Sequence, residues 1–512
     1  MHAAVGPMRR DLNELGSVEH DVLVIGGGIQ GACIAWDAAL RGLDVALVER
    51  DDFGAATSAN SLRIVHGGIR YLARGDLARM RDSIRERSAL LRVAPGLVEP
   101  LPVLVPTGRP GVPGRAAFGA ALTLTHLLSL ARNRHLDPSR RIAAGQVLSR
   151  PECLRLFPAL DPAGLSGGAL WYDARMTRPE RLTLAFVVSA ASAGARVANH
   201  AEADGFEVSG GRVRSVIVVD RLTGRRHEVR ARQVVIAAGP WTEALTGRAG
   251  KAVGPAPGTP RHALALNLVV GRRVAEVAVG LRSTSTSDGD PGGSGGRFLF
   301  LAPQEGSTLL GTWYGVAEDG TDPGPALDKG AETLLADFDR ACPGLGLSTN
   351  DVVGRQWGRL PLKAGLEAGP SATLAERPRV NGRDVAGPAN LLAVEAVKYT
   401  TARAVAQGVV DLVLASMGLG PRACRTAETP LVGAELVSGV RPSLALRILH
   451  AARDEMAVTL DDVVYRRTEL GDPPGPDRGA VGLAARIAGD ALGWDEERRV
   501  AEEASVLRAG AA

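Results

Sequence analysis

The sequence predicts an α/β protein with more than one domain. Its 512 residues exceed what a single hydrophobic core normally serves. Residues 21–50 have the pattern of strand, tight turn, helix and strand, which is a βαβ unit. Segments between about residues 205 and 239 alternate between apolar and polar residues and predict strands, while the chain from residue 433 has the spacing of amphipathic helices.

The opening βαβ unit consists of three consecutive segments. DVLVIG (21–26) is a continuous apolar run suited to a buried parallel strand. IQGACIAWDAALRG (29–42) has helical spacing and ends at Gly42, and DVALVER (44–50) predicts the second strand. These elements place the glycine-rich turn directly between a strand and a helix.

A second helix is predicted over residues 76–95, with the sequence DLARMRDSIRERSALLRVAP. Asp76 is suited to the N-cap, and the helix should end before Pro95. One face of this helix is expected to be apolar, and it would carry Leu77, Met80, Ile84 and Leu91.

The rest of the chain predicts further strands, one loop and C-terminal helices. GRVRSVIVVD and RHEVRARQVVIAAG predict two strands, and STSTSDGDPGGSGG (283–296) predicts a mobile loop inside a domain because strand-like sequence resumes at RFLFLAP. LALRILHAARDEM and AVGLAARIAGDALGWDEERRVAEEASVLRAG predict amphipathic helices near the C-terminus.

Composition excludes several classes of protein. The net charge of +4, from 60 basic and 56 acidic residues, gives no indication of a nucleic-acid partner. The cysteines have neither metal-ligand nor redox spacing, so we expect reduced thiols in a cytosolic setting, no disulfide and no metal site. These cysteines are Cys33, Cys153, Cys342 and Cys424.

Neither a signal peptide nor a membrane span is expected. The first 20 residues lack the apolar core of a signal peptide, and no run reaches the roughly 18 apolar residues of a spanning helix. The apolar segment 116–131 comes nearest to one and is followed by the basic segment 132–141. Two alternatives remain for it: a buried helix with a solvated basic end, which we favour from the sequence alone, or a helix at an anionic membrane surface.

The glycine-rich turn predicts a dinucleotide site. Gly26, Gly28 and Gly31 form G-x-G-x-x-G, in which glycine permits the turn and lets backbone N–H groups approach a pyrophosphate at the helix N-terminus. Glu49, at the end of the second strand, is placed to accept hydrogen bonds from a ribose diol, and its charge disfavours a 2′-phosphate. These residues alone leave nicotinamide and flavin cofactors open.

Longer motifs resemble one family. The N-terminal segment up to HGGIRYL is similar to the FAD-dependent, membrane-associated glycerol-3-phosphate dehydrogenases. Further similar segments follow in the same order along the chain: SIRERSALLRVAPGLVEPLPVLVP, AAGPWTEAL, LLGTWYG, WGRLPL, VKYTTARAVAQGVVDLVL and DDVVYRRTELG. The resemblance implies an α/β fold with an FAD-binding Rossmann-like domain, an antiparallel-sheet substrate domain interleaved with it over residues 20–432, and a C-terminal helical domain over residues 433–512. Residues 1–19 are expected to be an N-terminal tail.

The resemblance also implies four candidate catalytic residues. Arg70 and Arg359 match positions that face the substrate, and a guanidinium suits an anionic group. Lys398 matches a lysine beside the flavin, where an ammonium stabilises the anionic reduced ring or polarises the substrate oxygen. His66 has two interpretations that we weight equally: an acid or base, or a residue that only shapes a turn.

Further residues are expected to line the cofactor. They are hydroxyl-bearing residues and a glycine in matched motifs: Thr57, Ser58, Ser61, Gly239, Thr400 and Thr401. For the hydroxyl residues, ordinary turn or helix capping is the alternative.

The sequence departs from the family pattern in the expected pocket. Asn267 stands where a histidine is often found, and Trp313 and Tyr314 replace a small hydroxyl residue and a carboxylate. We expect the two aromatic side chains to reshape the pocket, which leaves the exact substrate open.

These observations predict an FAD-dependent dehydrogenase that oxidises sn-glycerol 3-phosphate, or a close anionic analogue, and passes electrons to quinone. An FAD-dependent amine or amino-acid oxidase and a flavin-bound protein without turnover are the alternatives. The resemblance further implies a cytoplasmic protein, peripheral on the cytoplasmic face of the inner membrane, that forms a homo-oligomer.

Overall fold

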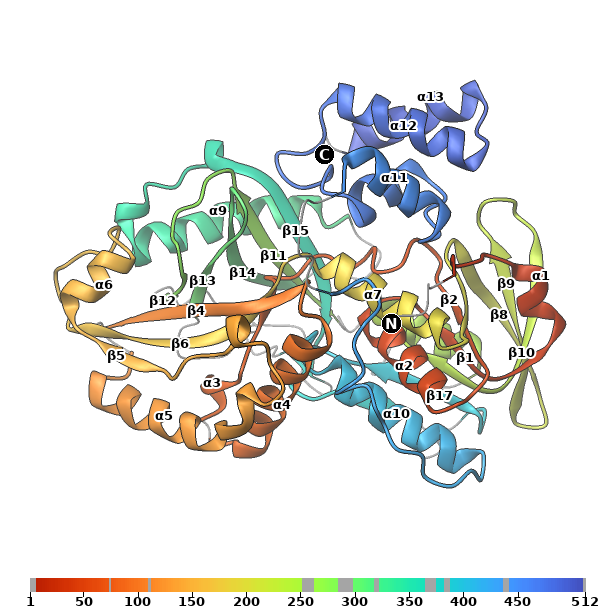
Figure 1. Ribbon diagram of the computed structural model, residues 1–512, viewed down its shortest axis with the longest axis horizontal. Coiled ribbons are helices and arrows are strands. Elements are labelled where there is room, and N and C mark those ends of the chain that lie inside the picture. The colour runs from red at the N-terminus through yellow and green to blue at the C-terminus, as the bar shows by residue number, and fades with distance from the viewer. Residues whose placement is uncertain are drawn as a thin grey trace.

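The computed structural model describes residues 6–72, 75–108, 112–250, 262–283, 298–316, 322–363, 374–381, 387–435 and 442–509. These residues form two sheets with flanking helices and a separate group of C-terminal helices (Figure 1). The predicted α/β class is confirmed. The predicted loop at 283–296 lies, apart from its first residue, outside the described residues.

The first sheet is built on the predicted βαβ unit. β1 (Glu19–Ile25) pairs in parallel with β2 (Val45–Val48) and β10 (Arg226–Ile236), and α2 (Ile29–Leu40) connects β1 to β2. The described strands follow the order β16-β17-β10-β1-β2-β7, with β9 also paired to β10 and β8 paired to β9. Their bounds are β7 (Arg196–Ala198), β8 (Ala201–Ser209), β9 (Arg212–Asp220), β16 (Arg379–Asn381) and β17 (Leu391–Glu395).

Both faces of this sheet are covered, which explains why its central strands are apolar throughout. Val22 and Val24 of β1 belong to a core beneath α2, α7 (Pro179–Ser192) and α10 (Ala402–Ser416). Leu23 and Ile25 face the opposite side and belong to a second core. Helix α1 (Leu12–Ser17) contributes to that second core, so part of the expected N-terminal tail is a helix packed on β10.

The second sheet is largely antiparallel, as expected. Its described strands follow the order β15-β11-β14-β13-β12-β4-β6-β3, with β5 beside β6, and the pairing of β4 with β12 is parallel. Helix α9 (Gly324–Ala341) packs on β14, and α5 (Arg115–Leu128) lies against β6. The strand bounds are β3 (Ile64–Val65), β4 (Val98–Thr107), β5 (Gln146–Leu148), β6 (Gly167–Met176), β11 (His262–Val270), β12 (Ala278–Arg282), β13 (Phe298–Pro303), β14 (Thr308–Val316) and β15 (Val352–Pro361).

The helix predicted after Asp76 is α4 (Leu77–Val93), and the Asp76 side chain accepts a hydrogen bond from the Arg79 N–H. Its apolar face is mostly as expected, because Met80, Ile84 and Leu91 are buried, but Leu77 is exposed. The other short helices are α3 (Ile69–Leu72), α6 (Arg150–Leu156) and α8 (Thr242–Arg248).

Helix α5 contradicts the interpretation favoured from sequence. Leu122 is the buried residue of this helix, whereas Leu124 and Leu127 are 37% and 57% exposed, and Leu130 just beyond it is 68% exposed. A helix buried in the core is therefore wrong for this segment, since most of its apolar side chains are not covered by the rest of the described chain. No helix among the described residues is long and apolar enough to cross a membrane.

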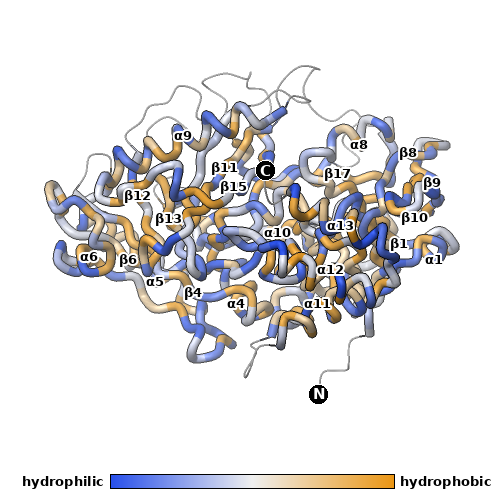
Figure 2. The backbone as a smooth tube through the Cα atoms, turned by 90° about the horizontal axis from the view of Figure 1, so that it is seen from above, coloured by the Kyte–Doolittle hydropathy of each residue, from blue (hydrophilic) through white to orange (hydrophobic). Residues whose placement is uncertain are grey.

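The C-terminal helices have a hydrophobic core of their own. α11 (Leu444–Arg453), a π-helical turn (Asp462–Arg467), α12 (Arg478–Leu492) and α13 (Glu496–Ala509) lie together at the top of Figure 1. The amphipathic stretch 480–510 is two helices rather than one, because Gly493 adopts a φ of +72° and ends α12. In Figure 2, outer helices such as α9 alternate between hydrophobic and hydrophilic residues, as expected for helices with one buried face.

Candidate active site

A cavity of about 1340 Å³ is lined by residues from both sheets. The first sheet contributes the glycine loop after β1 and the segment after β17, and the second contributes β11, β13, β14 and β15. This volume exceeds the roughly 300–1,000 Å³ typical of a pocket for one small ligand. The cavity therefore has room for a dinucleotide together with a second molecule.

The three motif glycines have different surroundings. Gly26 has a φ of +107°, and a Cβ there would lie 2.6 Å from the Ala237 carbonyl oxygen. Gly28 is the N-cap of α2 and lines the cavity with Gly26. Gly31 is not among the described residues that line the cavity. A Cβ at Gly31 would lie 1.8 Å from the Gly26 carbonyl oxygen, so the lack of a side chain at Gly31 permits the close contact of helix and loop. Glycine at positions 26 and 31 thus permits a tight turn that brings the N-terminus of α2 to the cavity, and this cradle fits a pyrophosphate.

Glu49 follows β2 directly and lines the same cavity. Its carboxylate accepts hydrogen bonds from the N–H groups of Gly27 (2.6 Å) and Asp51 (2.9 Å). Burial raises the pKa of Glu49, and the two N–H donors oppose that effect. The carboxylate is therefore fixed beside the glycine loop, where a ribose diol would meet it.

The hydroxyl residues of the 55–61 segment both line the cavity and cap local structure. Ser58 Oγ accepts from the Ile29 N–H (3.0 Å) and so caps α2, whose N-cap glycine has no side chain. Ser61 Oγ accepts from the Arg63 N–H (3.2 Å), and Thr57 Oγ1 donates to the Arg359 carbonyl (3.5 Å). Capping and cavity lining therefore coexist in Ser58 and Ser61, whereas Thr57 lines the cavity and connects this segment to β15.

Of the three remaining residues expected to line the cofactor, two line the cavity and one does not among the described residues. Thr400 and Gly239 line the cavity, and Gly239 has a φ of +55°. Thr401 is the N-cap of α10 without a side-chain capping hydrogen bond, and it is not among the described lining residues.

Three cations, Arg70, Arg79 and Lys398, surround the ring of Tyr71, and we call them the cation cluster. The Lys398 Nζ lies 4.5 Å from the centre of the Tyr71 ring, and the Arg70 and Arg79 Cζ atoms lie 5.2 and 5.3 Å from it. The Tyr71 hydroxyl contacts Lys398 Nζ and accepts from Arg70 Nη2 (3.3 Å). Burial, reinforced by Arg70, lowers the pKa of Lys398 to about 8. Arg79 is paired with Asp76 (2.6 Å) and Glu376 (2.8 Å), so the positive charge suited to an anion comes from Arg70 and Lys398.

His66 faces the cavity with a carboxylate behind it. Its Nδ1 lies 3.0 Å from Asp173 Oδ2, and the other oxygen, Oδ1, accepts from the Gly67 N–H (2.7 Å) and Arg87 Nη1 (3.3 Å). Burial favours the neutral form of Asp173, but His66 and Arg87 outweigh it and lower the pKa of this carboxyl. An ionised carboxylate on Nδ1 fixes the imidazole tautomer and directs Nε2 away from Asp173.

Asp173, Tyr71 and Arg79 were not among the residues selected from the sequence. Asp173 lies in β6, far along the chain from His66, and no motif connects them. Tyr71 stands next to Arg70 in HGGIRYL, so its position in the matched motif could have identified it as a candidate.

The departures from the family pattern fall on both sides of the second sheet. Of these departures, Asn267 and Tyr314 line the cavity, as does the matched Arg359, and the buried Asn267 accepts a hydrogen bond from the Thr312 hydroxyl (2.7 Å). Trp313 packs toward α9 instead, since a Cβ at Gly330 would lie 2.7 Å from its ring. Of the two aromatic residues expected to reshape the pocket, Tyr314 lines it, whereas the expectation is wrong for Trp313.

Comparisons with known proteins agree with this geometry. Residues 21–373 match the family model described as FAD dependent oxidoreductase. The chain is 34% identical to glycerol-3-phosphate dehydrogenase 1 of Mycobacterium tuberculosis, covering 82% of this chain and 78% of that protein. It is 28% identical to glycerol-3-phosphate dehydrogenase of Synechocystis, covering 96% of both chains.

Solved structures show the same fold. The structure of glycerol-3-phosphate dehydrogenase from Bacillus halodurans complexed with FAD matches with a TM-score of 0.72 at 22% identity, covering 98% of this chain and 96% of that one. Glycine oxidase from Bacillus cereus matches with a TM-score of 0.52 at 18% identity, over 78% of this chain and 98% of that one. With the glycine cradle, Glu49 and the cation cluster in one cavity, these matches establish that the chain belongs to the FAD-dependent oxidoreductases, within the glycerol-3-phosphate dehydrogenase family.

Proposed function

We propose that this protein uses FAD to oxidise sn-glycerol 3-phosphate, or a close anionic analogue, and passes the electrons to quinone. The observation that carries this proposal is the cation cluster, which shares one cavity with the glycine loop and Glu49. A small dianion bound there would be held within reach of a cofactor whose pyrophosphate lies on the N-terminus of α2.

The anion is held by groups of two kinds. Arg70 offers a guanidinium fork, and Lys398 offers a compact ammonium whose position is fixed by the Tyr71 hydroxyl. Arg359 reaches the cavity from β15 in the other sheet. Charges from both sheets therefore converge on one molecule, which orients its carbon chain as well as binding it.

The proton is taken by His66. Asp173 holds Nδ1, so Nε2 is the nitrogen that accepts the proton of the substrate hydroxyl, and the buried carboxylate stabilises the imidazolium that results. FAD, when bound, would accept the hydride from the substrate carbon that carries this hydroxyl.

The acceptor and the membrane contact are inferred from α5. Phe118, Ala121 and Leu124 of this helix form one wall of the cavity, and Phe298 and Phe300 continue that apolar lining. Leu127 and Leu130 extend the apolar surface outward, and the basic segment 132–141 follows. An apolar quinone suits this wall, and an exposed apolar helix with nearby arginines suits peripheral attachment to an anionic membrane on its cytoplasmic face.

Two further expectations remain proposals. We place the division between the FAD-dependent oxidoreductase region (20–432) and the C-terminal helical domain (433–512) where the sequence suggested it, supported by the separate core of the C-terminal helices. We also expect a homo-oligomer, which size-exclusion chromatography with light scattering would test.

An amino-acid oxidase is the second candidate function. The fold likeness to glycine oxidase favours it, because an arginine in such a cavity also grips a carboxylate. The two charges of Arg70 and Lys398 beside Tyr71 favour a dianion over the single carboxylate of an amino acid.

Anaerobic flavin reduction tests the proposal. The protein is purified with FAD in mild detergent, sn-glycerol 3-phosphate is added, and the absorbance near about 450 nm is followed. Bleaching that quinone reverses supports the proposal. Bleaching by an amino acid and not by glycerol 3-phosphate would establish the oxidase instead.

A pair of arginine variants locates the substrate. Arg359→Ala should raise the apparent KM by about ten- to a hundredfold with FAD still bound, because a charge-assisted hydrogen bond contributes about 1.5–3 kcal/mol. Arg355→Ala is the matched control, since this arginine lies on the same strand but pairs with Asp328 on the outside. Equal kinetics for the two variants would remove Arg359 from the site.

A further inference from the structure

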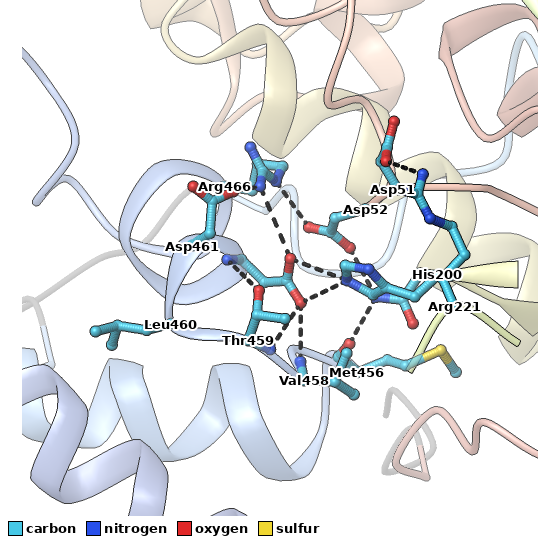
Figure 3. A network of polar contacts seen from close by, with 12 residues as sticks. Asp51, Asp52, His200, Arg221, Met456, Val458, Thr459, Leu460, Asp461 and Arg466 are labelled. Carbon is cyan, nitrogen blue, oxygen red and sulfur yellow. Dashed lines mark hydrogen bonds and ion pairs between the residues drawn. The ribbon is translucent and has the colours of Figure 1, made fainter. Parts of the chain in front are cut away.

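The motif DDVVYRRTELG connects the C-terminal helices to the loop that carries Glu49. Residues 462–467 of this motif form the π-helical turn, and Arg466 and Arg467 extend from its end toward Asp52. Figure 3 shows Arg466 and Asp52 facing each other across the contact between the two parts of the molecule. None of the described residues after Thr400 lines the cavity, so this motif lies outside the site described above.

Asp52 is the centre of the contact. Its carboxylate is buried and accepts hydrogen bonds from Arg467 Nη2 (2.8 Å), Arg466 Nε (3.1 Å) and Asn199 Nδ2 (2.9 Å), and Arg467 Nη1 contacts it as well. Burial opposes ionisation, but the two arginines outweigh it and lower the pKa of Asp52 to about 2. Because both Asp52 and Arg467 are buried, each depends on the other for its charge to be tolerated.

The turn itself is fixed by Asp462. This carboxylate accepts from the N–H groups of Val458 (2.9 Å) and Thr459 (3.0 Å), and His200 Nε2 lies 3.1 Å from it. The His200 backbone N–H donates in turn to the Asp51 carbonyl (2.8 Å). The C-terminal motif therefore contacts the loop at Asp52 and, through His200, at Asp51.

The same loop shapes the cofactor cradle. The Asp51 N–H holds the Glu49 carboxylate, and the Gly54 N–H donates to the Gly27 carbonyl (3.1 Å). Between them, Phe53 packs so closely on the glycine loop that a Cβ at Gly27 would lie 2.7 Å from its ring. Asp52 is thus flanked by Asp51, which holds Glu49, and by Phe53, which packs on Gly27.

We propose that Arg467, through Asp52, is a positioning residue for FAD, so that the Arg467–Asp52 contact, rather than docking of the C-terminal helices as a whole, is thermodynamically linked to binding of the adenosine end of FAD. Arg467 does not touch the cofactor; it holds the loop that presents Glu49 and packs on Gly27. The inference concerns the cofactor alone and holds for any substrate of the site.

The test compares two arginines at the same contact. Arg467→Met removes the Asp52 partner, whereas Arg181→Met removes an arginine of α7 that binds Glu455 of the C-terminal part with two hydrogen bonds (2.7 and 2.8 Å) but does not contact the 49–54 loop. FAD dissociation from each holoenzyme is measured by the flavin fluorescence that appears on dilution. We expect Kd to rise about tenfold or more for Arg467→Met and to stay within about threefold for Arg181→Met, in the range of typical coupling between sites.

A double-mutant cycle assigns the effect to Asp52. In an Asp52→Asn background, Arg467→Met should change the Kd for FAD by less than about threefold, because the charge that Arg467 compensates is gone. An equal loss of FAD in both backgrounds, or equal losses for Arg467→Met and Arg181→Met, overturns the proposal.

The unmodified protein provides a measurement that does not depend on a variant folding. Linkage is reciprocal, so FAD added to the flavin-free protein should slow amide hydrogen exchange in residues 458–467 and leave exchange in α13 unchanged. Exchange in residues 458–467 that is the same with and without FAD would refute the coupling.

Discussion

The lowered pKa of Lys398 predicts how substrate capture depends on pH. If the ammonium of Lys398 holds the anion, only the protonated lysine binds it well, and the free enzyme should lose affinity as pH rises through about 8. Substrate binding would then take up a proton, because the dianion favours the charged form of the lysine.

The size of the effect follows from the shift. With a pKa of about 8, Lys398 is about 90% protonated at pH 7 and about 3% protonated at pH 9.5, whereas a lysine at its ordinary value near 10.5 would still be about 90% protonated at pH 9.5. We therefore expect kcat/KM for glycerol 3-phosphate to fall about 30-fold between these two pH values.

The assay is a pH profile of kcat/KM with a water-soluble electron acceptor, measured on the unmodified protein and on Lys398→Arg. The guanidinium stays charged over this range, so the variant should have a flat profile, at a lower absolute value because its planar group does not match the ammonium. A falling limb near pH 8 that persists in Lys398→Arg would refute the reasoning, as would a flat profile for the unmodified protein.

Three further predictions concern the cradle, the base and α5. Gly31→Ala should yield protein without FAD, judged by the ratio of flavin to protein absorbance, because its Cβ would lie 1.8 Å from the Gly26 carbonyl; Gly119→Ala, whose Cβ meets an ordinary contact at 3.6 Å, should keep FAD. Asp173→Asn should slow substrate-driven flavin reduction by about 10²- to 10⁴-fold with FAD retained, since His66 loses the carboxylate that orients it; a rate within twofold of the unmodified protein would argue against His66 as base. Leu127→Asp with Leu130→Asp should abolish sedimentation with anionic vesicles without changing turnover of a water-soluble acceptor, whereas Leu222→Asp, at an exposed leucine in the turn between β9 and β10, should still sediment.

The sequence determined the elements whose signals are local. The apolar runs on both sides of the glycine turn specify the βαβ unit, because a strand buried on both faces needs apolar residues throughout and the turn needs glycine at Gly26. Asp76 could be assigned as an N-cap because its hydrogen bond spans only three residues. The residues selected from matched motifs also fall largely in one cavity, since those motifs lie at the ends of strands and helices that meet there.

The tertiary structure alone decided what depends on register and on contacts between distant segments. Trp313 and Tyr314 are adjacent, and which of them enters the cavity depends on the phase of β14, because neighbouring residues of a strand face opposite sides. Whether α5 is buried depends on what packs against it, which its apolar composition does not record.

The partners of the buried charged residues also depend on the tertiary structure. Asp173 meets His66 across 107 residues of chain, and Arg467 meets Asp52 across 415. A buried charge requires a partner, but the sequence does not say which of many opposite charges supplies it. The sequence thus determined the glycine turn of the cofactor cradle and the family. The tertiary structure determined that Asp173 orients His66 and that Arg467 holds the loop of the cradle, because these contacts join segments far apart in the chain.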